Sequence, residues 1–73
     1  MNILFEMQRF YKEAGYVRKG IRHYGGGFMQ AIGEAMDMAD INNLHKIKDT
    51  WNKEWLQYLE MGRRAERNEE NDE

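Results

Sequence analysis

The strongest periodic pattern in the sequence lies in residues 40–62, which read DINNLHKIKDTWNKEWLQYLEMG. At 3.6 residues per turn, the large apolar side chains of this segment fall on one narrow stripe of a helix. The stripe consists of Leu44, Ile47, Trp51, Trp55 and Tyr58. Asp40 is a favourable N-cap and Gly62 a common stop signal. We therefore predict one long helix over residues 41–61, with its aromatic stripe in the core.

A second helix is predicted over residues 28–39, where apolar residues cover an unusually wide arc. They are Phe28, Ala31, Ile32, Ala35, Met36, Met38 and Ala39. A wide apolar arc indicates contact with more than one neighbour, so we place this helix at the centre of the fold. Only Asp40 separates it from the long helix. The two must form a sharp antiparallel hairpin or merge into one bent helix.

The first third of the chain has weaker signals. Residues 2–14 have helical periodicity, with Asn2 as N-cap and Gly15 in position to end the helix. Residues 16–24 have helical spacing, but Gly20 costs about 1 kcal/mol relative to alanine, so a short, marginal helix or a loop is predicted. The glycines at 25–27 break the pattern. The predicted fold class is all-α: a small bundle of three or four helices with a C-terminal helical hairpin.

Composition narrows the class of protein further. The chain has 73 residues, no cysteine, no proline and a formal net charge of −2, which fits one domain with a small core, placed at 1–62. Without cysteine there is no disulfide framework. Residues 63–73 hold a single apolar residue, so we expect a charged, frayed and disordered tail. The longest uncharged run, 24–33, is too short to span a bilayer and no signal peptide is visible, so we expect a cytoplasmic protein without membrane association.

Several short motifs in the second and third quarters of the chain form a recognisable pattern. They are RHY at 22–24, GGF at 26–28, AIGEA at 31–35, AD at 39–40, Asn43, KI at 46–47, and Trp51 and Trp55. This order resembles a group of small uncharacterised helical proteins encoded by phages and prophages. The resemblance implies a phage accessory protein in the host bacterial cytoplasm, and it carries over no catalytic residue. Asn52 stands where that pattern has a proline, so here the last helix is expected to run unbroken.

Candidate chemistry is sparse. His23 and His45 are the only histidines and share no local ligand spacing, so no metal site and no cofactor are expected. His45 falls just off the apolar stripe and is interpreted as a partly buried, satisfied side chain. The chain has no serine and no cysteine, and Thr50 lies on the predicted outer face. Nucleophilic catalysis therefore has no candidate, and we do not expect an enzyme.

The basic segment 16–24 and the glycines at 25–27 leave two interpretations open. Backbone N–H groups at a helix start attract phosphate, and nearby arginines would strengthen that attraction. No P-loop motif is present, and a flexible hinge beside a solvated basic face is the favoured interpretation. A small DNA-binding regulator using segment 16–24 is a minority hypothesis, because the helix that follows carries Glu34 and Asp37 outward and no base.

The function predicted from the sequence is protein binding. The apolar surface of the two later helices, with Phe5 and Leu56, exceeds what one short antiparallel packing can cover. We expect a non-enzymatic phage accessory protein that binds and modulates a bacterial host protein, with inhibition as the favoured effect and a defence-system component as one candidate target. The expected anchors are the large residues least explained by the core: Phe5, Arg18, Lys19, Arg22 and Tyr24. A homodimer or a homo-oligomeric phage structural component is the remaining alternative.

Overall fold

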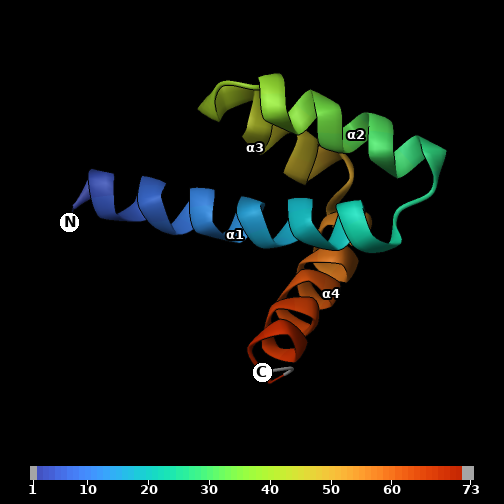
Figure 1. Ribbon diagram of the computed structural model, residues 1–73. Helices are drawn as coiled ribbons and strands as arrows, with labels where there is room; N and C mark the ends of the chain where they lie inside the picture. Colours follow the sequence, from blue (N-terminus) through green and yellow to red (C-terminus); the bar gives the residue numbers. More distant parts are fainter. Residues whose placement is uncertain (1, 72–73) are drawn as a thin grey trace.

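The computed structural model describes residues 2–71, and within this range the chain forms four helices (Figure 1). They are α1 (Ile3–Tyr24), α2 (Gly27–Met38), α3 (Ile41–Thr50) and α4 (Asn52–Asn71). The predicted all-α class is confirmed. In Figure 1, α1 runs through the middle, α2 and α3 lie above it, and α4 crosses it and extends below.

The core is built around α1, which packs most extensively against α4. Val17 and Ile21 of α1 and Trp55 of α4 are the largest fully buried side chains in the described part of the chain. The rest of the core cluster comprises Ala14, Met29, Met36, Leu44 and Leu59. The prediction that helix 28–39 lies at the centre is therefore wrong. One face of α2 packs against α1, and the opposite face of α2 is exposed.

Residues 3–24 form one continuous helix, not the two pieces predicted from Gly15 and Gly20. The Asn2 side chain caps its start by accepting hydrogen bonds from the backbone nitrogens of Leu4 and Phe5, at 3.1 and 3.3 Å. None of the glycines in the described range adopts a positive φ, so Gly15 does not end a helix. Packing against α4 outweighs the low helix propensity of the two glycines.

Gly20 and Gly62 lie where α1 and α4 cross, and both are buried. A Cβ atom on Gly20 would overlap the carbonyl oxygen of Tyr58, and one on Gly62 would overlap the carbonyl oxygen of Tyr16. The two backbones can approach this closely only because neither position has a side chain. Gly62 is therefore a packing residue inside α4, and its predicted role as a stop signal is wrong.

The predicted helix over 41–61 is interrupted at Trp51. This residue has φ −114° and ψ 43°, outside the helical region, and it separates α3 from α4. Its ring packs edge-on against Phe28 of α2, with the ring centroids 5.1 Å apart. The expectation that Asn52 in place of proline leaves the helix unbroken is wrong. Only α3 forms the hairpin with α2, and α4 turns away to pack on α1.

The C-terminal segment is helical as far as the structure describes it. Helix α4 continues to Asn71, and Ala65 is buried, so the described part of the predicted tail, 63–71, is helical. The predicted domain boundary at 62 falls inside this continuous helix. Residues 72–73 of the predicted tail lie outside the described residues.

Two short connections position α2 and α3. The Gln30 amide donates hydrogen bonds to the carbonyl oxygens of Ile21 and Gly25, at 2.7 and 3.1 Å, and so ties α2 to the end of α1. These contacts hold the linker that was interpreted as a flexible hinge. Asp40 caps α3 as predicted, with its carboxylate accepting from the Asn43 backbone nitrogen at 2.8 Å.

Candidate functional site

A polar cluster joins α1, α3 and α4 around Glu13. One carboxylate oxygen of Glu13 accepts hydrogen bonds from Lys48 Nζ at 2.7 Å and from Trp55 Nε1 at 2.8 Å. Partial burial would raise the pKa of Glu13, but the two hydrogen bonds and the positive charges of Lys48 and Arg63 outweigh it and lower this pKa. The acid is therefore ionised and already paired within the fold.

Stacked rings surround this cluster. Phe10 lies parallel to His45, with ring centroids 3.9 Å apart, and nearly parallel to Trp55, with centroids 5.7 Å apart. The Lys48 ammonium lies 5.5 Å from the Phe10 ring centroid and 5.8 Å from the Trp55 centroid, within cation–π range. His45 is exposed overall, with one ring face against Phe10. The expectation of a partly buried histidine is wrong in its degree of burial.

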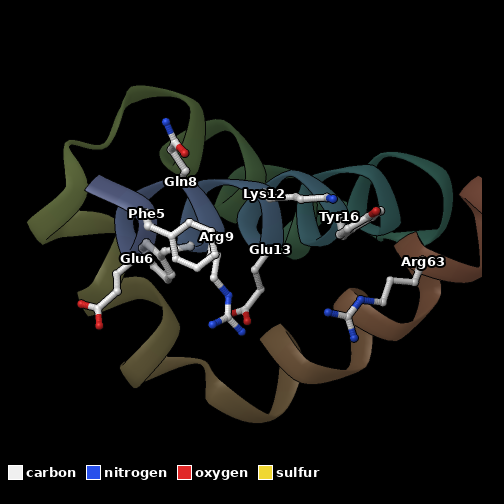
Figure 2. A pocket seen from close by; sticks show the side chains of 9 residues that line it. Phe5, Glu6, Gln8, Arg9, Lys12, Glu13, Tyr16 and Arg63 are labelled. Atoms are coloured by element: carbon white, nitrogen blue, oxygen red, sulfur yellow. The ribbon is translucent and has the colours of Figure 1, made fainter. Parts of the chain in front are cut away.

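A groove opens on the solvent side of this junction, with a volume of about 760 Å³ (Figure 2). It is lined by Phe5, Glu6, Gln8, Arg9, Phe10, Lys12, Glu13, Tyr16 and Arg63. Figure 2 shows Arg9 and Glu13 from α1 and Arg63 from α4 directed into the same space. A smaller hollow of about 240 Å³ shares Tyr16 and Arg63 and continues the groove toward Arg67. We call the two together the α1–α4 groove.

The groove combines one exposed aromatic ring with several bases. Phe5 is 54% exposed, and the Arg9 guanidinium lies 5.8 Å from its ring centroid. At the other end, Arg63 lies 5.7 Å from the Tyr16 ring centroid. Glu13 is already bonded to Lys48 and Trp55. The remaining charges in the groove are the bases Arg9, Lys12, Arg63 and Arg67 and the acids Glu6 and Glu66, so it offers an excess of positive charge beside apolar area. Such a surface suits a ligand with a carboxylate and an apolar side chain.

Arg18, one of the predicted anchors, is held inside the fold. Its Nε and Nη2 donate to the two carboxylate oxygens of Asp37 at 2.9 and 2.8 Å, so α1 and α2 are joined by a bidentate ion pair. These hydrogen bonds raise the pKa of Arg18 and lower that of Asp37. The Arg18 side chain is only 16% exposed and lies against Gly33, where a Cβ atom would collide with the guanidinium. Arg18 therefore joins α1 to α2 and is less available to a partner than its position in the sequence suggests.

The other predicted anchors are far from Phe5. Arg22 and Tyr24 are exposed at the C-terminal end of α1, and Lys19 is half-buried. Tyr24 lies nineteen residues along the helix from Phe5, which is about 28 Å at 1.5 Å per residue. The predicted set therefore does not form one surface, and of its members only Phe5 lines the α1–α4 groove.

Sequence reasoning missed the groove residues other than Phe5. The residues Phe5, Arg9, Lys12 and Tyr16 follow i, i+4, i+7 and i+11 spacing, which places them on one helix face. That spacing was a usable signal for a mixed aromatic and basic face. Arg63 comes from a segment predicted to be disordered, so nothing in the sequence pattern pointed to its place opposite α1.

Other kinds of site find no support in the described part of the chain. No group of three or more residues there could hold a metal ion, and no helix is long and apolar enough to cross a bilayer. Comparison with protein-family models, with curated proteins and with solved structures finds no match to this chain.

Proposed function

We propose that this chain is a non-enzymatic binding module whose α1–α4 groove takes a segment of another protein. The observation that supports the proposal is the exposed ring of Phe5 in one groove with three bases: Arg9 lies near the ring, and Lys12 and Arg63 line the groove further along α1. A contiguous patch of exposed apolar side chains rimmed by polar residues marks an interaction site, and Ile3 and Leu4 beside Phe5 are exposed as well. Aromatic and arginine side chains are also the residues that most often carry binding energy.

The groove defines the chemistry of the proposed partner. From Phe5 to Tyr16 its α1 wall measures about 16 Å, the length of three helical turns. A segment of that length can place an apolar side chain on Phe5 and carboxylates near Arg9 and Arg63. We therefore propose that the partner presents an acidic amphipathic segment, because its charges complement the bases of the groove.

The resemblance to small phage and prophage proteins extends the proposal to the identity of the partner. On that basis the target is a protein in the cytoplasm of the bacterial host, and binding inhibits it by covering a functional surface. A component of a host defence system is the first class to test. A DNA-binding role through segment 16–24 is less favoured, since Arg18 in that segment is paired with Asp37.

The groove can be tested with a synthetic probe. The probe is a fourteen-residue amphipathic helical peptide of leucine and glutamate, and its counterpart has lysine at every glutamate position. Calorimetric titration should show that the acidic peptide binds and that the lysine peptide does not. The affinity for the acidic peptide should fall as the salt concentration rises. Failure to prefer the acidic peptide, or binding of duplex DNA in place of both peptides, contradicts the proposal.

Neighbouring arginines on α4 supply a matched pair of variants. Arg63 lines the groove, whereas Arg64 is 62% exposed in its side chain and pairs with Glu60 at 3.1 Å. Arg63→Glu should weaken peptide binding at least tenfold, and Arg64→Glu should change it less than threefold. Capture of proteins from bacterial lysate should show the same ranking. Equal losses in the two variants would mean that net charge governs binding and that the groove does not.

A further inference from the structure

Helix α2 has an exposed apolar stripe that no other part of the described chain covers. The stripe consists of Phe28, Ala31, Ala35 and Met38, with Phe28 57% exposed and Met38 87% exposed. The spacing i, i+3, i+7 and i+10 is that of the seam along which two helices pack. It lies on the face of α2 away from the buried residues Met29, Gly33 and Met36.

The stripe is symmetric about its own midpoint. Phe28 and Met38 are each five residues from position 33, and Ala31 and Ala35 are each two residues from it. When two copies of such a helix pair antiparallel, each large end residue meets the other large end residue, and each alanine meets an alanine. We propose that α2 pairs antiparallel with α2 of a second copy of this chain, Phe28 against the partner's Met38.

A hollow beside the stripe fits this register. It has a volume of about 480 Å³ and lies between α2 and α3, lined by Ala35, Met38, Ala39, Asn43, Lys46, Ile47, Thr50 and Trp51. The Phe28 ring leans toward α3 in its own copy, where it packs edge-on against Trp51. In the proposed pair, a two-fold axis perpendicular to both helices places the α3 helices of the two copies on the same side of the pair, so both Phe28 rings lean toward that side. The partner's Phe28 is thereby directed into the hollow next to Met38.

The area available sets the strength of the pairing. Four side chains over three turns, together with the walls of the hollow, offer roughly half of the ~800 Å² per partner that stable interfaces bury. An obligate dimer needs more than this. The pairing is therefore weak and concentration-dependent.

Charge near the axis gives this pairing a salt dependence of its own. Glu34 borders the stripe, and the two-fold axis brings the Glu34 residues of both copies to the same side. The two Glu34 carboxylates repel each other. The electrostatic attraction between Arg18 and Glu34 within each copy offsets this repulsion only in part. Added salt should therefore tighten the dimer. Peptide binding in the α1–α4 groove should weaken with salt, so the failure of one proposal can be distinguished from the failure of the other.

Sedimentation equilibrium from 10 μM to 2 mM tests the pairing. The mass should rise from 8.8 kDa toward twice that value as concentration increases. Met38→Glu should raise the dissociation constant at least tenfold. Leu56→Glu is the matched control, because Leu56 is a 53% exposed apolar residue of α4, and it should have no effect. A monomer throughout the range, or a dimer unaffected by Met38→Glu, overturns the proposal.

Disulfide trapping tests the register, since the native chain has no cysteine. Phe28→Cys mixed with Met38→Cys should cross-link into a mixed dimer. Each variant alone should not, because like positions are ten residues apart along the helices, about 15 Å, and a disulfide needs Cα atoms within ~7 Å. Cross-linking of Phe28→Cys with itself at the rate of the mixture contradicts the antiparallel register.

Discussion

Replacing Gly62 by alanine tests the close approach of α1 and α4. Helix propensity alone favours alanine by about 1 kcal/mol. The added methyl group, however, would overlap the carbonyl oxygen of Tyr16, which is backbone and cannot rotate away. Overpacking of a core costs about 1–3 kcal/mol, and an obstacle of backbone atoms places this site at the upper end. The expected net loss in unfolding free energy is about 2 kcal/mol.

Gly15→Ala is the matched control, because it is the same substitution with open space around it. Here only the propensity gain operates, and the unfolding free energy should rise by about 0.5–1 kcal/mol. Urea unfolding followed by circular dichroism and tryptophan fluorescence measures both changes. In thermal unfolding, Gly62→Ala should lower the midpoint by about 8–16 °C. A rise in both variants would show that helix propensity governs position 62 and that the two helices are not in backbone contact there.

Two further predictions concern the ion pairs. Because the folded-state pKa of Glu13 is lowered, its contribution to stability is complete above its unfolded pKa of about 4.3 and is lost as pH falls through the folded-state value. Below pH 5, the thermal midpoint of Glu13→Gln should therefore fall less steeply with decreasing pH than that of the wild type. The exposed control Glu60→Gln should follow the wild type, and parallel plots of midpoint against pH for all three proteins would refute this. Asp37→Asn removes the partner of the largely buried Arg18 and should cost about 1 kcal/mol in urea unfolding; a loss no larger than in Glu34→Gln would assign the ion pair no structural role.

Local signals in the sequence located the starts of α1, α2 and α3, but not that of α4. Asp40 and Asn2 cap helices as predicted, and the segment 28–39 is helical to within one residue at each end. The glycines were misinterpreted for a common reason. Their low propensity is a local property, whereas the burial of Gly20 and Gly62 depends on the contact between two segments 42 residues apart in the chain. The break at Trp51 has a similar origin, because the ring contact with Phe28 joins two helices.

The candidate site was predictable only in part. Phe5 was expected to be an anchor because it projects among charged residues, and it does line the α1–α4 groove. Arg18 was expected to be available to a partner in the same way, because no sequence pattern predicts its bidentate ion pair with Asp37, nineteen residues away. Arg63 depends on the course of α4 beyond Gly62. A single sequence gives the face of each helix but not the angle at which two helices cross.

The crossing at Gly20 and Gly62 also sets the mouth of the groove. The two helices contact each other through their backbones at this crossing point. From there the N-terminal part of α1 and the C-terminal part of α4 diverge (Figure 1). The distance between the two helices at the crossing is set by the absence of a Cβ atom at Gly20 and at Gly62. A substitution at either glycine would therefore change the width of the groove, and with it the segment that the groove is proposed to accept, without itself contacting that segment.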